Sequence, residues 1–250
     1  MRVFKGVLLA CAVVVTAAAQ SQDPPIGDTR LTVHTLLRED VFSGFLDNNM
    51  ERFARADRNL DALLTQRPDQ RANLLAWKAG MNLYRAVLAH EAGKAADFAK
   101  YFKDAKDGFA EAAKLATGDE HDGVAPITGG TYAVFADRLP QEYRAAAWQQ
   151  AYESYSVLWK TQGPQIDKMP VHFQGEVLAG MAQSAQRTGR AEESAQFVDR
   201  MLTLMVDTPF EKTARQWKTN PSSAASSNLT CKNCHAAGRL TAKLAALQAK

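Results

Sequence analysis

The chain has 250 residues, of which 46% are hydrophobic, and a formal net charge of +3. This length allows one large or two small domains with a real hydrophobic core, and a charge so close to zero argues against nucleic acid as the main partner. The charge is unevenly spread: residues 211–250 carry a net +6, which leaves −5 for the preceding residues once Arg2 and Lys5 are set aside. The basic segment either attracts an acidic protein partner or is simply solvated.

Residues 1–19 have the pattern of a secretory signal peptide. Two basic residues precede an apolar run over residues 7–19 that ends in three alanines. A basic start, a short apolar run and a small-residue cleavage site mark a segment that is removed on export. We therefore expect cleavage near Ala19 and a periplasmic or otherwise exported protein. The run is shorter than the roughly 20 residues of a membrane-spanning helix, so we expect no transmembrane segment in the mature chain, and a lipid anchor at Cys11 is disfavoured.

Residues 32–218 have a helical pattern. They are rich in good helix formers, their apolar residues recur every three or four positions, and no sustained alternation of apolar and polar residues occurs. The sequence therefore predicts an all-α domain built from antiparallel helical hairpins, as an array or a bundle. Three apolar stripes are Val41, Phe42, Phe45, Leu46, Met50 and Phe53; Leu74, Trp77, Met81, Tyr84 and Leu88; and Tyr101, Phe102, Ala105, Phe109 and Ala112.

Small residues and prolines recur along this region at the offsets of a helical repeat. Gly44, Ala56, Leu60, Leu63 and Pro68 resemble one degenerate tetratricopeptide unit. Similar but less regular sets begin at two later glycines, Gly80 and Gly180. The resemblance implies hairpins stacked in a row, with a concave face able to bind a protein partner. The number of repeats stays open.

Breaks in the helical pattern separate these units. Residues 119–138 contain Asp-Gly, Pro and Gly-Gly steps, which predict a long and functional loop. Pro140 should open the next helix, whose aromatic stripe faces either the core or a cofactor or peptide groove. After a break at residues 163–170, helices are expected over residues 173–186 and 192–206. Residues 219–229 have the composition of a flexible linker. The aromatic stripe expected in the helix after Pro140 consists of Tyr143, Trp148, Tyr152, Tyr155 and Trp159.

Residues 230–250 carry the pattern Cys231-Lys-Asn-Cys234-His235. Two thiols three residues apart followed by an imidazole form a c-type haem attachment site, in which both thiols bind the porphyrin and His235 ligates the iron. No second cysteine pair exists for a zinc ribbon, and no strand–helix–strand pattern supports a thioredoxin-like redox site. An exposed dithiol is the alternative.

The position of this motif near the end of the chain resembles that in cytochrome c′, and the chain as a whole resembles a monohaem c-type cytochrome. The resemblance to cytochrome c′ implies a haem-bearing last helix and an open sixth iron position. Fifteen residues follow His235, with no methionine among them. We therefore expect the haem to be covered by the preceding helices, by a partner, or hardly at all.

The sixth iron ligand is open on sequence alone. Histidine and methionine are the usual axial ligands, and His34 and His90 are less favoured because each lies within an apparent helical stripe. The candidates are His172, His121, Met169, Met201, Met205 or none.

Two functions fit these features. The first is a monohaem electron carrier or redox subunit, not an enzyme, whose helical body docks a protein partner with an acidic docking face. The second is a haem-based sensor or gas-binding protein with an open sixth position. A peroxidase-like enzyme is a weaker third, because no distal His–Arg pair is apparent.

Overall fold

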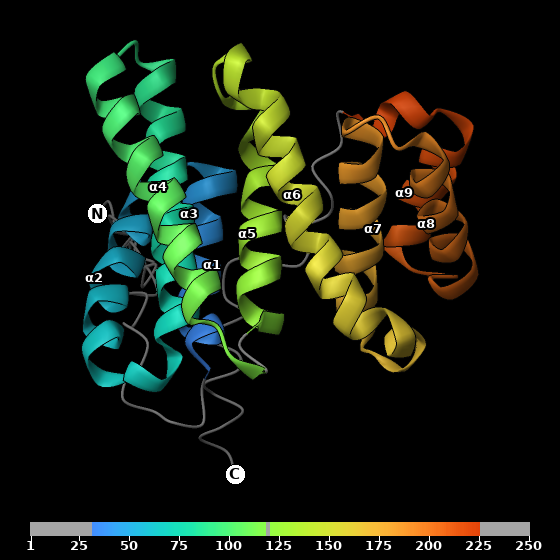
Figure 1. The fold of residues 1–250 in the computed structure, drawn as a ribbon, viewed down its shortest axis with the longest axis horizontal. Coiled ribbons are helices and arrows are strands. Elements are labelled where there is room, and N and C mark those ends of the chain that lie inside the picture. The colour runs from blue at the N-terminus through green and yellow to red at the C-terminus, as the bar shows by residue number, and fades with distance from the viewer. Residues whose placement is uncertain (1–31, 119–120, 226–250) are drawn as a thin grey trace, which may run out of the picture.

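The computed structural model describes residues 32–118 and 121–225, so the predicted signal peptide, residues 226–229 of the predicted linker and the Cys231–His235 motif lie outside the described residues. Within them the fold is all-α (Figure 1). No helix in these two ranges is long and apolar enough to cross a membrane. The α-helices are α1 Val33–Asp47, α2 Met50–Gln66, α3 Arg71–Glu91, α4 Ala95–Leu115, α5 His121–Phe135, α6 Gln141–Gln162, α7 Val171–Arg187, α8 Ala191–Leu204 and α9 Pro209–Thr219.

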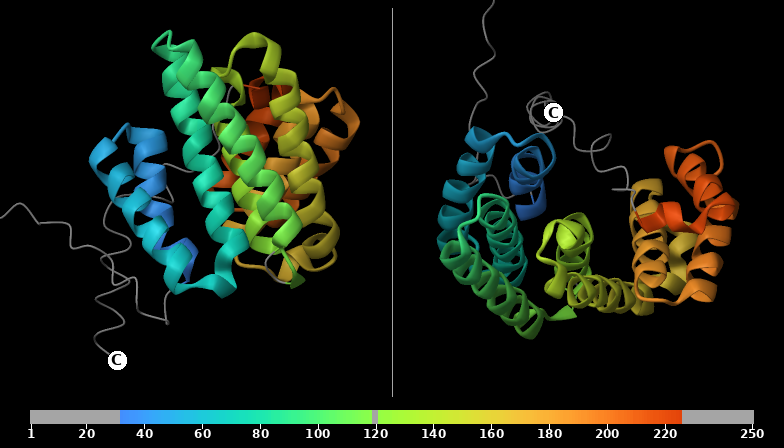
Figure 2. Two further views of the ribbon diagram at one scale, coloured as in Figure 1. Left: turned by 60° about the vertical axis from the view of Figure 1, so that its left-hand side comes forward. Right: turned by 90° about the horizontal axis from the view of Figure 1, so that it is seen from above.

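Successive helices pair as antiparallel hairpins, which confirms the predicted fold. α1 packs on α2, α3 on α4, α5 on α6 and α7 on α8, and α9 then covers α8. Seen from above, the hairpins follow one another around an arc (Figure 2). The array therefore has an outer and an inner side, and the inner side is where the candidate site lies.

Glycines bring the paired helices close together. A Cβ added at Gly44 would lie 2.6 Å from the ring of Phe53, and one at Gly108 would lie 3.0 Å from Cβ of Ala79. A Cβ at Gly180 would overlap the ring of Tyr155 at 2.3 Å. Gly44 and Gly180 are glycines that carried the tetratricopeptide resemblance, and here they allow side chains of a neighbouring helix to reach the backbone.

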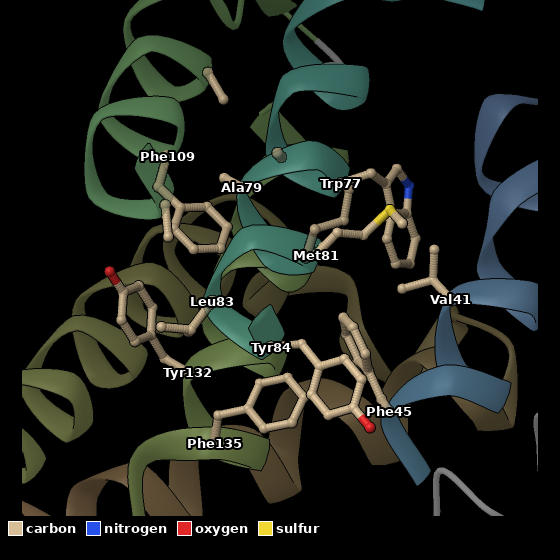
Figure 3. Close-up of a cluster of buried hydrophobic side chains, with 14 of the residues drawn as sticks. Val41, Phe45, Trp77, Ala79, Met81, Leu83, Tyr84, Phe109, Tyr132 and Phe135 are labelled. Atoms are coloured by element: carbon tan, nitrogen blue, oxygen red, sulfur yellow. The ribbon is translucent and has the colours of Figure 1, made fainter. Parts of the chain in front are cut away.

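The larger core joins the first three hairpins. We call this cluster, which includes Leu36, Phe45, Tyr84 and Phe135, the N-terminal core. Aromatic rings dominate its centre: Phe45 meets Phe135 edge to face at 4.8 Å between centroids, and Tyr84 stacks on Phe135 at 5.2 Å (Figure 3). Aromatic pairs of this kind add directional contacts to the area they bury, so this core has a specific packing arrangement.

A second cluster joins α6–α9 and is called here the C-terminal core. It includes Leu178, Met201 and Trp217, which are at most 1% exposed. The 3₁₀ helix η5, Pro221–Ala225, packs on α7 and α9, and Ala224 is 1% exposed. Residues 221–225 of the predicted linker are thus part of the helical body.

A buried charge cluster ties α1 to α2. The Asp40 side chain is fully buried, and its Oδ1 accepts hydrogen bonds from Arg52 Nε at 2.8 Å and from Arg55 Nη2 at 2.5 Å. Arg55 Nε also donates to Asp40 Oδ2 at 2.6 Å. Charge-assisted bonds of this kind satisfy a carboxylate that burial alone would strongly destabilise.

The predicted loop over residues 119–138 is wrong. Residues 121–135 form α5, and the 3₁₀ helix η3, Ala136–Arg138, continues it. The small residues that suggested a loop instead allow close packing: a Cβ at Gly129 would lie 2.9 Å from the ring of Tyr155. Pro126 costs one backbone hydrogen bond near the start of the helix, and the contacts of α5 with α3 and α6 outweigh this local cost.

Candidate functional site

A cleft of about 320 Å³ opens on the inner side of the array, between the N-terminal and C-terminal cores. α5 forms its floor, while α1 and α3 line one wall and α7 with α9 lines the other. The lining is largely apolar, with aromatic rings on both walls and two imidazoles, a guanidinium and a carboxylate among them. Its main side chains are His34, Arg38, Phe42, Trp77, Ile127, Val134, His172, Phe173, Glu176 and Phe210.

Small residues of α5 leave room for the cleft. Gly123 and Gly130 line the floor together with Pro126. A Cβ at Gly123 would lie 2.2 Å from Asn73 Oδ1 and 2.9 Å from His34 Nε2, so the backbone of α5 directly supports these two side chains. The residues that were expected to form a functional loop therefore do contribute to the cleft, but as a rigid helix.

His34 is held by a hydrogen bond from α3. Trp77 Nε1 donates to His34 Nδ1 at 3.2 Å. Burial, reinforced by the charge of Arg38, lowers the pKa of His34 from 6.5 to about 4. The ring is therefore neutral at pH 7 and, because Nδ1 accepts this hydrogen bond, its proton resides on Nε2.

Arg38 follows His34 by one helical turn and is the cationic group of the cleft. Its Nε is buried and has no hydrogen-bond acceptor among the described residues. Its charge reaches Glu176 on the opposite wall, where it lowers the pKa of that carboxyl, although burial has the larger effect and raises the pKa overall. A buried guanidinium nitrogen without an acceptor is costly, so the described residues alone leave Arg38 incompletely satisfied.

His172 and Glu176 form a pair on α7, one turn apart. Nε2 of His172 lies 3.6 Å from Oε2 of Glu176, and the histidine side chain is 46% exposed. Both line the cleft. His172 is thus the accessible imidazole of the cleft among the described residues, whereas His34 is enclosed by Trp77 and α5.

The other predicted ligands are elsewhere. Met201 and Met205 are fully buried in the C-terminal core, and Met169 packs against the same core from the segment before α7. His90 lies at the end of α3 against Phe98 of α4. His121 begins α5, but its side chain lies outside the described residues, as do Cys231, Cys234 and His235. The structure therefore brings His172 and His34 into one cleft and leaves the described methionines out of it.

Sequence reasoning missed the charged partners of the cleft. Arg38 and Glu176 were not identified as site residues, and Trp77 was assigned only to the core. Arg38 lies one turn after His34, as Glu176 does after His172. These two pairs at i, i+4 spacing were the available sequence signal. That they face each other across one cleft depends on the curvature of the whole array, which the sequence pattern does not reveal.

No group of three His, Cys, Asp or Glu side chains that could hold a metal ion comes together within residues 32–118 and 121–225. The cleft does fit an apolar ring system with carboxylate substituents. Apolar walls would cover the ring, the Arg38 side chain that lines the cleft would supply a positive charge for a carboxylate, and two imidazoles also line the cleft. Comparison with protein-family models, curated proteins and solved structures finds no match to the chain.

Proposed function

We propose that this protein is an exported monohaem c-type cytochrome that acts as an electron carrier or redox subunit, with a helical body that docks a protein partner. The observation that carries the proposal is the Cys-Lys-Asn-Cys-His sequence at residues 231–235, in a chain whose residues 1–19 resemble a signal peptide. This spacing suits covalent haem attachment. Haem of the c type is attached outside the cytoplasm, so an export signal and a haem-attachment motif are expected in the same chain.

The three motif residues have distinct roles. Cys231 and Cys234 would hold the haem covalently, each thiol adding its sulfur to one carbon of a porphyrin vinyl group and its hydrogen to the neighbouring carbon. The imidazole of His235 would hold the iron through a nitrogen lone pair. When bound, haem supplies reversible one-electron chemistry. The protein's part is to hold the ring and to set its reduction potential through burial, charge and hydrogen bonds.

The cleft supports this proposal. Its walls offer aromatic and aliphatic side chains from both cores, which would exclude water from a porphyrin. Arg38 offers a positive charge whose Nε has no acceptor in the described part of the chain. Such a group would stabilise the negative charge of a propionate.

Docking of an acidic partner is proposed for the basic end of the chain. In its described part, α9, Arg215 already bonds Glu211 and Lys218 pairs with Asp199 at 2.7 Å. These pairs reduce the attraction that the two basic groups exert at a distance, so most of the attraction would come from Lys212, Lys232, Arg239, Lys243 and Lys250. The association rate with an acidic partner should then fall as ionic strength rises.

The proposal is tested on protein expressed together with a haem-attachment system. The mature chain should be coloured, should gain the mass of one intact haem, and should keep its haem in a denaturing gel. A double variant, Cys231→Ser with Cys234→Ser, should lose the covalent haem band. A colourless wild-type chain with the mass of the bare polypeptide would rule out the cytochrome.

The sensor is the second candidate, because the motif by itself fixes one axial ligand and leaves the other position to be filled or not. Reduced-state spectra with and without carbon monoxide distinguish the two. Rapid formation of a carbonyl complex favours the sensor, and a six-coordinate spectrum that is unchanged by the gas favours the electron carrier.

A further inference from the structure

We infer that the inner cleft is the distal pocket of the protein's own haem: the segment 226–250 places its haem in the cleft, His172 supplies the sixth iron ligand, and Arg38 binds a propionate. The inference rests on the proposed function and adds what the Cys-x-x-Cys-His motif does not contain. It names the place of the haem, its second ligand and its charge partner.

The length of chain between η5 and the Cys-x-x-Cys-His motif allows the motif to reach the cleft. The described chain ends at η5, which packs on α7, the helix that forms one wall of the cleft. Cys231 follows Ala225 by six residues. Six residues span at most about 20 Å when extended, and α7 with its 17 residues is about 25 Å long. The haem-bearing residues therefore start within reach of most of the α7 wall.

The second argument is the chemistry of the cleft. A porphyrin needs apolar walls for its faces and positive charge or water for its propionates. The cleft has Trp77 and Phe42 on one wall and Phe173 on the other. It also has Arg38, whose Nε is buried without an acceptor among the described residues. A peptide partner would satisfy the apolar walls equally well, but it would leave the histidines of the cleft without a role.

The choice of His172 follows from the state of the other candidates. His34 uses the Nδ1 lone pair to accept the Trp77 hydrogen bond, so ligation through Nε2 would move its proton to Nδ1 and set two donors against each other. Met201 and Met205 could reach an iron only by leaving a fully buried core. His172, by contrast, is half-exposed and lines the cleft.

Glu176 gives His172 the orientation that metal-binding histidines commonly have. Its carboxylate lies 3.6 Å from one imidazole nitrogen. A carboxylate beside one ring nitrogen stabilises the proton there, which puts the lone pair on the other nitrogen and makes that nitrogen a stronger donor to a metal. In its ionised form Glu176 would therefore favour the tautomer in which Nδ1 of His172 is the donor to the iron.

The test uses the full-length matured protein with covalent haem. Wild type should give a low-spin, six-coordinate ferric spectrum by electron paramagnetic resonance and optical absorption. His172→Ala should become high-spin with the covalent haem band unchanged, and added imidazole should restore the low-spin spectrum. His90→Ala, which removes a histidine at the far end of α3, should leave the spectrum as in wild type.

Two further variants probe the pocket without touching the ligand. Gly130→Leu fills the floor of the cleft and should also give a high-spin spectrum, because the haem is kept from His172. Arg38→Gln should remain low-spin but shift the reduction potential downward, because the lost positive charge favoured the electron-rich ferrous state.

Three outcomes would overturn the inference. A low-spin spectrum that survives His172→Ala would show that another group ligates the iron. A loss of the low-spin spectrum in His121→Ala, with His172 intact, would show the same. A wild-type protein that is already high-spin and binds carbon monoxide at once would show an open position and favour the sensor. Each of these results requires covalent haem to be present, so none of them can be confused with failure of the cytochrome proposal, in which no haem is attached.

Discussion

Two charged regions of the N-terminal half use arginine in opposite ways. Between α1 and α2, Arg55 donates two hydrogen bonds to the fully buried Asp40. On the inner side of α1, two positions before Asp40 in the chain, Arg38 has a buried Nε without an acceptor in the described structure. The first region thus has its charges paired within the described residues, whereas the second keeps a buried donor that, in our inference, lies beside the binding site of a haem propionate. The predictions below test this contrast.

The largest effect is expected from Asp40→Asn. The substitution keeps the size of the side chain but leaves the buried Arg55 without its counter-charge, and breaking one side of a buried pair typically costs about 3–5 kcal/mol. Urea unfolding of the wild-type and variant proteins measures this cost.

A matched control comes from an exposed pair. Lys78 and Asp61 lie 2.8 Å apart with side chains 40% and 62% exposed. Asp61→Asn should cost about 0.5 kcal/mol or less, since solvent screens such pairs. If Asp40→Asn proved as mild as Asp61→Asn, the buried cluster would not be the structural tie described here.

The next effect is a dependence of stability on pH that arises from His34. Burial and the charge of Arg38 lower its pKa from 6.5 to about 4, so below pH 6.5 the unfolded chain binds a proton that the folded protein does not. Stability from this group is full above pH 6.5 and is lost as the pH falls towards 4, by about 3 kcal/mol in total.

The measurement compares urea unfolding at pH 7, 5.5 and 4 for wild type and His34→Gln. Glutamine does not titrate, and its amide oxygen can accept the Trp77 hydrogen bond. The difference in free energy of unfolding between wild type and His34→Gln should change by about 3 kcal/mol across this pH range. A constant gap would mean that the imidazole is not enclosed by Trp77 and α5.

Much of the fold, but little of the cleft, could be predicted from sequence. Apolar stripes identify helices because the 3.6-residue period is local, and they correctly predicted the helical hairpins. The residues of α5 were mistaken for a loop because Gly123, Pro126 and Gly129 weaken a helix locally, and their packing against α3 and α6 is a long-range fact. Arg38 and Glu176 were missed for the same reason: each looks like a surface charge until the two walls are brought together.

Two glycines near the same tyrosine test whether α7 is closely packed against Tyr155 while α5 is open towards the cleft. A Cβ at Gly180 would lie 2.3 Å from the ring of Tyr155, whereas one at Gly130 would lie 3.4 Å from its hydroxyl oxygen. Gly180→Ala should therefore cost about 1–3 kcal/mol through overpacking. Gly130→Ala should be neutral or gain up to about 1 kcal/mol, because alanine favours the helix. Thermal unfolding of both variants gives the comparison, and an equal loss in both would argue that α5 is not open on its cleft side.

The most informative effect on stability is expected from Arg38→Leu. In the haem-free chain with Cys231→Ser and Cys234→Ser, this substitution removes a buried donor that has no acceptor among residues 32–118 and 121–225. It should change the free energy of unfolding by less than about 1 kcal/mol, in either direction. In the matured protein the same substitution should be clearly destabilising, because a propionate would lose its partner. The measured quantity is the change in free energy of unfolding caused by Arg38→Leu in the matured protein, minus the change that it causes in the haem-free chain. If Arg38→Leu were as costly without haem as with it, Arg38 would be a structural residue like Arg55, and the contrast between the two arginines would disappear.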